Sequence, residues 1–389
     1  MDEFDVIVVG GGLVGLSLAL ALQRNGLRLA LVDRAAAPSD IDEGGWDSRV
    51  YAISPGSEAF LRELAAWPDD EARIAPVYEM QIFGDRQPGK LHFSAYDAHV
   101  AHLASIAEGR LLTRALWGAL GGHPQPVVFA GQACTGVEWQ EGAGQLTLAD
   151  GTVLRGRLLA AADGGDSWLR SQAGIAARVK PYGHTAVVAN FACEHDHRGT
   201  AFQWFRADGV LALLPLPQRR VSMVWSAIQP LADKLLTMDA PALCEQVAQA
   251  ACSSVGKLEL ITPPTGFPLR LIRVPQLVRP RLALLGDAAH NLHPLAGQGV
   301  NLGFQDAQAL VQVLETRGGC GDVGELRLLR RYERARREDI LAMTLATDGL
   351  QRLFSIQSGP FSVLRNLGMA LVDRAGPLKT TLVHHALGA

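Results

Sequence analysis

The chain has 389 residues, of which 48% are hydrophobic and 19% charged, and its formal net charge is −3. This composition excludes a disordered chain, and the length exceeds a typical domain of about 100–200 residues, so we expect two packed domains. The small negative charge predicts no nucleic-acid partner. Five scattered cysteines without a C-x-x-C pair indicate free thiols in a reducing compartment, so we expect a cytoplasmic protein.

The N-terminal residues predict a dinucleotide-binding turn. Residues 4–9 form an apolar, β-branched run typical of a buried parallel strand, and a helix follows over residues 13–25. Between them, Gly10, Gly12 and Gly15 complete G-x-G-x-x-G. In this motif the first glycine permits a tight turn, the second lets the backbone approach a pyrophosphate, and the third lets the helix pack on the sheet.

The helix that follows this turn and the next strand complete the nucleotide-binding pattern. The helix begins at Leu13 and Val14, where free amides and the positive end of the helix dipole favour a phosphate. A second strand over residues 29–32 ends at Asp33, which can accept hydrogen bonds from an adenosine ribose; Arg34 lies beside it. The apolar residues 4–22 do not read as a targeting signal, because acids precede them and glycines interrupt them.

Two regions, one before and one after residues 158–170, predict an inserted antiparallel sheet. Residues 184–227 contain four strand-like runs separated by turn residues, and residues 77–83 and 91–93 are expected to join them. A helix is predicted over residues 239–253. Residues 267–274 return the chain to the first domain.

A second motif lies in residues 158–170, LLAAADGGDSWLR. An apolar strand runs into Asp163 and Gly164, and Ser167 can cap a short helix that carries Arg170. Taken alone, this pattern indicates only a capped strand–helix turn.

A third motif lies in residues 281–306. A strand over residues 282–285 ends at Gly286 and Asp287, and a loop with Pro294, Gly297 and Gly299 leads into a helix near Val300. The pattern predicts a carboxylate at a strand end and backbone amides at a second helix N-terminus, which can stabilise negative charge.

The chain is predicted to be helical after Asp306. Residues 330–339 carry interleaved charges of both signs, which favours a solvated helix face over contact with an anionic membrane. Residues 354–387 are more apolar, which favours packing on the domain, with membrane docking as the alternative.

Together the three motifs resemble those of class A flavoprotein monooxygenases, the para-hydroxybenzoate hydroxylase-like superfamily. A closer resemblance covers nearly the whole chain and is to the ring hydroxylases of ubiquinone biosynthesis. It is carried by residues 47–54 (DSRVYAIS), 202–217, 288–303 (AAHNLHPLAGQGVNLG) and 332–354. The chain departs from the family in having Asp33 where Glu is commoner, and in residues 108–110, which vary a usual Glu-Asn segment.

The resemblance implies an α/β fold: a Rossmann-like FAD-binding domain, an inserted antiparallel β-sheet substrate domain and a helical C-terminus. The expected FAD-binding domain comprises residues 1–75, 97–180 and 272–346, the substrate domain residues 76–96 and 181–271, and the C-terminal segment residues 347–389. The residues expected to contact FAD are Gly10, Gly12, Leu13, Val14, Gly15, Asp33, Arg34, Arg49, Arg110, Asp163, Gly286, Asp287, Pro294, Gly297, Gly299, Val300 and Asn301.

The implied activity is hydroxylation of an aromatic, lipid-soluble polyprenyl phenol, with FAD as cofactor, NADH or NADPH as reductant and dioxygen as co-substrate. No second G-x-G-x-x-G is present for the nicotinamide, as in a family without a separate NAD domain. Peripheral membrane contact, a homo-oligomer and a biosynthetic complex stay open.

Parts of the sequence also fit other functions and a metal site. A flavin-dependent halogenase or an isoprenoid reductase would use the same scaffold, although the halogenase pattern W-x-W-x-I-P is absent. A non-catalytic flavin-binding subunit would share the same motifs. Asp287, His290 and His293 have a spacing that metal ligands can have, but no fourth ligand is apparent, and we expect the two histidines to satisfy backbone groups. No residue identifies itself as a catalytic base.

Overall fold

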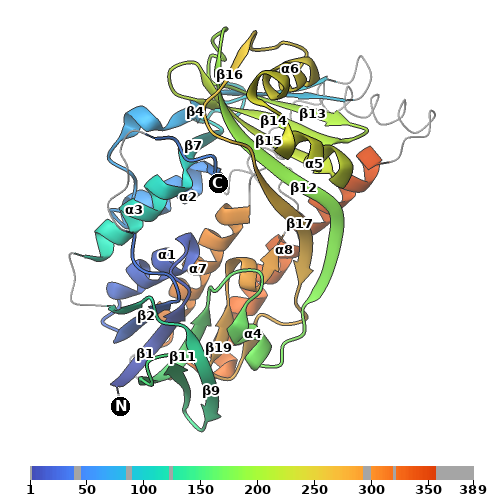
Figure 1. Cartoon of the computed structure of the whole chain (residues 1–389). Coiled ribbons are helices and arrows are strands. Elements are labelled where there is room, and N and C mark those ends of the chain that lie inside the picture. The colour runs from blue at the N-terminus through green and yellow to red at the C-terminus, as the bar shows by residue number, and fades with distance from the viewer. Residues whose placement is uncertain are drawn as a thin grey trace.

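The computed structural model describes residues 2–38, 45–84, 90–121, 126–291, 299–318 and 321–355. Two large β-sheets lie at opposite ends of the molecule (Figure 1). Two long strands, β12 (Arg178–Cys193) and β17 (Thr265–Arg273), extend from one sheet towards the other.

The first sheet is mainly parallel. Its strands are β1 (Asp2–Val9), β2 (Leu29–Asp33), β8 (Val127–Ala130), β9 (Cys134–Gln140), β10 (Ala143–Leu148), β11 (Val153–Ala161), β18 (Val278–Arg279) and β19 (Leu282–Leu284). The order is β18-β19-β11-β1-β2-β8, and every neighbouring pair from β19 to β8 is parallel. In such sheets ligands bind at the carboxyl ends of the strands, so the ends of β1, β2, β11 and β19 mark the place to examine.

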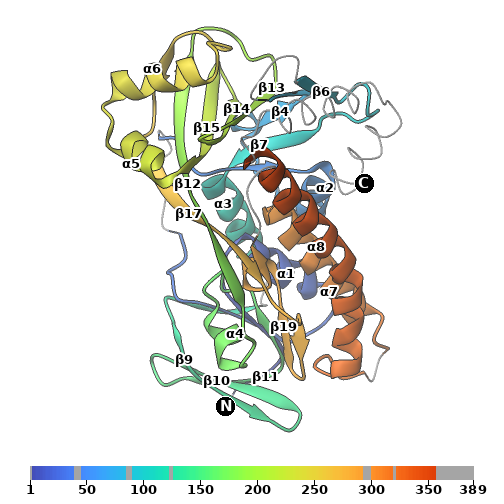
Figure 2. The same cartoon turned by 90° about the vertical axis from the view of Figure 1, so that its right-hand side faces the viewer.

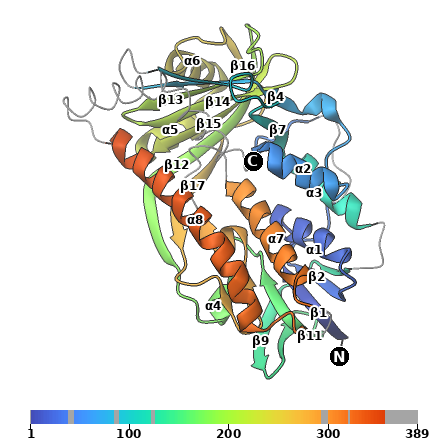
Figure 3. The same cartoon turned by 180° about the vertical axis from the view of Figure 1, so that it is seen from behind.

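Helices pack on this sheet and on one another. They are α1 (Leu13–Gln23), α2 (Pro55–Glu63), α3 (Gly109–Leu120), α4 (Trp168–Gln172), α7 (Gly299–Glu315) and α8 (Leu326–Ser355). Helix α1 is apolar nearly all round because it packs between the sheet and its neighbours α3 and α7. Figure 3 shows α7 between α1 and the long helix α8.

The second sheet is antiparallel apart from one pair. Besides β12 and β17 it contains β5 (Glu79–Phe83), β6 (Lys90–Ser94), β13 (Thr200–Arg206), β14 (Gly209–Leu216), β15 (Arg220–Ile228), β16 (Leu258–Leu260) and β20 (His290–Asn291). The order is β20-β17-β12-β15-β14-β13-β5-β6, with β16 beside β12. Strands β13 and β5 pair in parallel, and β5 comes from a segment far earlier in the chain.

One face of the second sheet packs on α5 (Gln229–Thr237) and α6 (Ala240–Ala250) (Figure 2). The apolar core there includes Met223, Trp225 and Trp204, and the partly buried Phe202 packs against it. Because side chains alternate along a strand, the other face of the sheet is turned away from these helices.

A small third sheet lies beside the second one. It contains β3 (Val50–Ile53), β4 (Ala75–Val77) and β7 (Ala104–Glu108), in the order β3-β7-β4. Two short 3-10 helices, η1 (Glu71–Arg73) and η2 (Gly286–Ala288), complete the described elements.

The predicted fold class is confirmed: a Rossmann-like sheet, an inserted and largely antiparallel sheet, and a helical C-terminal part. The predicted domain bounds stay a prediction. Helix α8 continues through residue 347, where the C-terminal segment was expected to begin, and residues 356–389 lie outside the described part. Among the described residues no helix is both long and apolar enough to span a bilayer.

Candidate functional site: a dinucleotide cleft

The first glycine loop takes its shape from the lack of side chains. Gly10 has φ +111°, and a Cβ at this position would collide with the carbonyl oxygen of Ala162, which follows β11. A Cβ on Gly15 would collide with the carbonyl oxygen of Gly10. Gly12 differs from both, because it is exposed and a Cβ there would meet nothing within 4 Å. The space above Gly12 is therefore open to a ligand.

Helix α1 begins at this open space with an uncapped end. The N-cap residue Gly12 has no side chain to cap the helix, and no acidic residue lies in its first turn. The carboxylate of Asp33 accepts hydrogen bonds from the amides of Gly11 and Ala35, so it fixes the loop against the end of β2. Arg34 is exposed beside it. Free amides at a helix N-terminus suit an anion, and the residues present therefore fit a pyrophosphate.

The second motif packs directly against this loop. Ser167 caps α4 by accepting a hydrogen bond from the Arg170 amide at 3.0 Å, as predicted. Asp163 accepts one from the Leu169 amide at 3.0 Å, while its other carboxylate oxygen is buried and has no hydrogen-bond partner among the described residues. The buried Arg170 donates to the carbonyl oxygen of Ala288 at 2.9 Å and so ties the second motif to the third.

The third motif reaches the first through Val14. Gly286 has φ +55°, and a Cβ there would lie 3.2 Å from Val14 Cγ2. A Cβ on Gly303 of α7 would lie 2.5 Å from the same atom. Val14 and its neighbour Leu13 are half-buried and pack on the core, so only their backbone amides are available to a ligand.

Asp287 and the start of α7 lie at this junction. Asp287 is exposed, but protein lies close around its carboxyl group. The resulting desolvation raises the pKa of Asp287, and the charges of His290 and Arg49 only partly offset this rise. Asn301 is buried and fully engaged: its Oδ1 accepts from the Ser54 amide at 3.0 Å, and its Nδ2 donates to the Ala52 carbonyl at 2.8 Å.

The engaged side chain of Asn301 leaves only its backbone amide to a ligand, whereas Gly299 and Val300 lie at the accessible first turn of α7. Pro294 and Gly297 lie outside the described residues.

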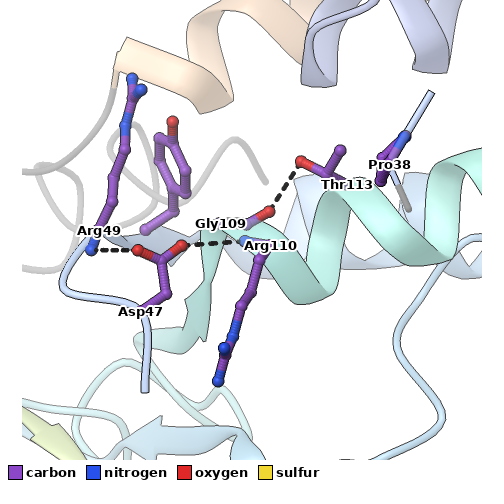
Figure 4. Close-up of a pocket in the computed structure, with 7 residues that line it drawn as sticks. Pro38, Asp47, Arg49, Gly109, Arg110 and Thr113 are labelled. Carbon is purple, nitrogen blue, oxygen red and sulfur yellow. Dashed lines mark hydrogen bonds between the residues drawn. The ribbon is translucent and has the colours of Figure 1, made fainter. Parts of the chain in front are cut away.

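A cavity of about 370 Å³ lies beside Asp47, whose carboxylate joins two of the segments that line it (Figure 4). It is lined by Pro38, Asp47, Arg49, Tyr51, Gly109, Arg110 and Thr113. The carboxylate of Asp47 accepts from the Arg49 amide at 2.9 Å and from the Arg110 amide at 3.2 Å. In Figure 4 the side chains of Arg49 and Arg110 extend in opposite directions from this bridge.

The two arginines have different surroundings. The exposed Arg49 guanidinium lies 5.3 Å from the ring centroid of Tyr51 and 5.6 Å from that of Phe267 in β17. Arg110 instead pairs with the fully buried Glu108 at 3.1 Å. Glu108 also binds Arg73 at 2.7 Å and accepts from the Asp47 amide at 2.6 Å. Arg49 is thus the arginine that presents an accessible charge.

The sequence did not single out Asp47, Glu108 or Asp306 as site residues. Asp306 is fully buried on α7 and accepts from the Gly286 amide at 2.9 Å, from His290 Nε2 at 2.6 Å and from Arg336 Nε at 2.8 Å. One signal was available for Asp306: it is an acid on the otherwise apolar face of a helix. For Glu108 and Asp47, the partners that join separate elements are Arg73 and the Arg110 amide, and these are too far away in sequence to give a local signal.

One expectation about a side chain was wrong. His290 binds the carboxylate of Asp306 rather than a backbone group, because β20 places it against α7; His293 lies outside the described residues. The expected solvated face of residues 330–339 is confirmed for most positions. Arg336 and Tyr332 are the buried exceptions, and Tyr332 donates to the Leu284 carbonyl at 2.8 Å. Around these positions the described residues contain no cluster of metal-ligating side chains.

Comparisons with known proteins agree with the geometry. The family described as FAD binding domain matches residues 127–346, and the family described as FAD dependent oxidoreductase matches residues 5–45. Ubiquinone hydroxylase UbiL of Rhodospirillum rubrum is 35% identical over 385 residues, which cover 99% of this chain and 89% of the relative. The 3-demethoxyubiquinol 3-hydroxylase of Escherichia coli is 32% identical over 387 residues, covering 99% of this chain and 98% of the relative.

A solved structure shows the same fold. PqsL of P. aeruginosa, determined in complex with 2-aminobenzoylacetate, superposes with a TM-score of 0.78 at 23% identity, covering 95% of this chain and 99% of PqsL.

Proposed function

We propose a reaction for this chain, which belongs to the family of FAD-dependent monooxygenases and, within it, to the ring hydroxylases of ubiquinone biosynthesis. The chain hydroxylates the aromatic ring of a polyprenylated phenol. One oxygen atom of dioxygen enters the ring and the other leaves as water, while NADH or NADPH supplies the two electrons. The observation that carries the proposal is the open, uncapped N-terminus of α1 at the point where all three motifs meet.

The cofactor contacts are part of the proposal. The backbone amides of Gly12, Leu13 and Val14 would hold the pyrophosphate, and Gly15 keeps α1 close to the sheet. Asp33 and Arg34 lie at the adenosine end. The other proposed contacts are Gly10, Arg49, Arg110, Asp163, Gly286, Asp287, Gly299, Val300 and the backbone of Asn301, with Pro294 and Gly297 outside the described residues.

FAD supplies the redox chemistry that transfers electrons from the nicotinamide to dioxygen. The chain supplies binding, orientation and electrostatics. The exposed carboxylate of Asp287 accepts hydrogen bonds from a hydroxylated chain of the cofactor, and the accessible charge of Arg49 faces the same space. The amides at the start of α7 favour negative charge on a ring placed there.

The second sheet is proposed to hold the substrate, with the domain division given above. Leu211, Leu213 and Met223 point towards α5 and α6, so Ala212 and Val224 point to the opposite face. Both are apolar and half-buried. An apolar wall of this kind suits an aromatic, lipid-soluble substrate and excludes water from the reaction.

The proposal is tested by the absorbance spectrum of the purified protein, followed by anaerobic titration with NADH and with NADPH. We expect flavin bands that one donor bleaches and that air restores, and faster bleaching in the presence of a prenylated phenol. A protein that binds no flavin after incubation with FAD would refute the proposed function.

A further inference from the structure

Asp306 is a buried, charged residue that several elements of the site contact. It lies on α7, two helical turns after the accessible start of that helix at Gly299, and accepts three hydrogen bonds from three other segments. Gly286 belongs to η2, His290 to β20 and Arg336 to α8. None of these partners is close in sequence to Asp306, so the carboxylate joins segments that only the tertiary fold brings together.

Asp306 is held as an anion. Burial by itself would raise its pKa, but His290 and Arg336 lower the pKa by more. Arg336 also donates hydrogen bonds to the Asp339 carboxylate at 2.6 Å and to the Gln305 amide oxygen at 3.1 Å. These additional hydrogen bonds restrain its guanidinium group. The Gly286 amide therefore points at a fixed negative charge.

We propose that His290, Asp306 and Arg336 form a positioning cluster that sets the geometry of the Gly286–Asp287 turn for FAD without touching the cofactor. This inference rests on the proposed function. The geometric ground is that Gly286 adopts a positive φ and is pinned through its amide, while the next side chain, Asp287, is exposed to the site. Moving the turn would move the Asp287 carboxylate with it.

The role of each partner follows from its place in the fold. His290 ties β20 to α7, and β20 pairs with β17 of the second sheet. Arg336 ties α8 to the same carboxylate. Through Asp306, the position of the Gly286–Asp287 turn is therefore fixed relative to both the second sheet and helix α8.

His290→Leu and His290→Gln test the cluster. Leucine removes the hydrogen bond to Asp306, whereas the glutamine amide keeps a donor of comparable reach. His102→Leu is the matched control, because His102 also donates to a buried carboxylate, that of Glu58 at 3.1 Å, but lies on a different part of the fold. The measured quantities are the FAD dissociation constant, the unfolding temperature of each apoprotein, and amide hydrogen exchange at Gly286.

We expect His290→Leu to weaken FAD binding by about ten- to hundred-fold and to speed exchange at Gly286, while His290→Gln stays within about threefold of the wild type. His102→Leu should lower the unfolding temperature and leave FAD affinity unchanged. If His290→Leu does not fold, His290→Asn takes its place, because its shorter amide does not reach Asp306.

Equal FAD affinity in His290→Leu and the wild type would overturn the inference. So would a loss that His102→Leu shares, since that would be a general loosening of the fold, or a loss of equal size in His290→Gln. A wild-type protein that fails to bind FAD would instead reject the proposed function, and the hydrogen-exchange comparison would still show whether His290 holds the turn.

Discussion

At the residue scale, the glycines of the first loop are required for different reasons. Gly10 and Gly15 have no room for a side chain inside the folded protein. Gly12 has room, an ordinary φ of −77° and an exposed position, so nothing in the fold itself requires glycine there. The requirement at Gly12 comes from the ligand that approaches its backbone.

Substituting Gly12→Ala therefore separates binding from folding. We expect the apoprotein to keep its unfolding temperature, since the added methyl group meets no atom within 4 Å, while FAD affinity falls. Gly15→Ala is the contrasting variant, and overpacking there should cost about 1–3 kcal/mol of stability. Calorimetry without FAD and fluorescence titration with FAD measure the two effects. Unchanged FAD affinity in Gly12→Ala would place the pyrophosphate elsewhere.

Glu58 gives a prediction about pH. Burial alone would raise the pKa of Glu58, but hydrogen bonds from His102, Ser105 and Arg62 outweigh this effect and lower the pKa to about 2. A carboxyl whose pKa is lower in the folded than in the unfolded state stabilises the fold above its unfolded pKa, and this stabilisation is lost as the pH falls through the folded value. The shift corresponds to an upper bound of about 3.4 kcal/mol, and solvent screening at this partly exposed carboxyl reduces it to about 1–2 kcal/mol.

Glu58→Gln should accordingly be less stable than the wild type at neutral pH, and the difference should shrink steadily as the pH is lowered from about 5 towards 2. Urea unfolding over this range, in the absence of FAD, measures it. A difference that does not depend on pH would mean that the carboxylate charge contributes nothing.

Residues of the site differed in how far sequence could predict them. Gly10, Gly15 and Asp33 lie within one strand–turn–helix–strand unit, so their spacing alone carries the information. Asp47, Glu108 and Asp306 act through partners on other elements. The charge of Arg336 suggested a solvent-exposed position, but tertiary packing places it beside Asp306.

At the element scale, α7 and α8 lie side by side (Figure 3), and the buried ion pair of Asp306 with Arg336 is one of the contacts that join them. Asp306→Asn keeps the shape but leaves the Arg336 charge without its buried partner. We expect a loss of about 3–5 kcal/mol in the free energy of unfolding.

The double variant Asp306→Leu with Arg336→Met removes both charges and should recover part of that stability. FAD affinity should not recover with it, because leucine offers no acceptor to the Gly286 amide or to His290. Urea unfolding and FAD titration of both variants give the comparison. A double variant that regains wild-type FAD affinity would show that the ion pair acts through stability alone.

Elements were predictable where their pattern was strong. The apolar strands β1 and β2, the runs that form β13 to β15, and α6 follow from composition and turn residues. The hairpin β9–β10 and the small sheet of β3, β4 and β7 were not predicted. Strand β9 mixes polar and apolar residues and has no buried one, and β3 and β4 are very short, so none of the three shows a clear alternation.

At the scale of the whole molecule, the site exists only when distant segments meet. Arg170 binds the third motif, Val14 packs between Gly286 and Gly303, and Asn301 holds the segment that leads from Arg49. The order of the motifs along the chain predicted a shared cofactor. It did not predict which side chains hold the motifs to one another.

A ligand that bridges these segments should stabilise the whole fold. With free FAD at a hundred times its dissociation constant, the free energy of unfolding should rise by about 2.7 kcal/mol. Thermal unfolding at increasing FAD concentrations measures this. An unfolding temperature that does not respond to FAD, in protein that retains the flavin, would indicate that the flavin stays bound when the chain unfolds and would contradict a site built by the whole fold.

The most direct measurement is the fate of isotopically labelled dioxygen. The FAD-loaded protein is incubated with NADH or NADPH, a prenylated phenol and labelled dioxygen in ordinary water, and the product is analysed by mass spectrometry. Ring hydroxylation by a monooxygenase predicts one added oxygen atom, and that atom carries the label. Nicotinamide oxidation without a hydroxylated product, or a product whose new oxygen comes from water, would contradict it.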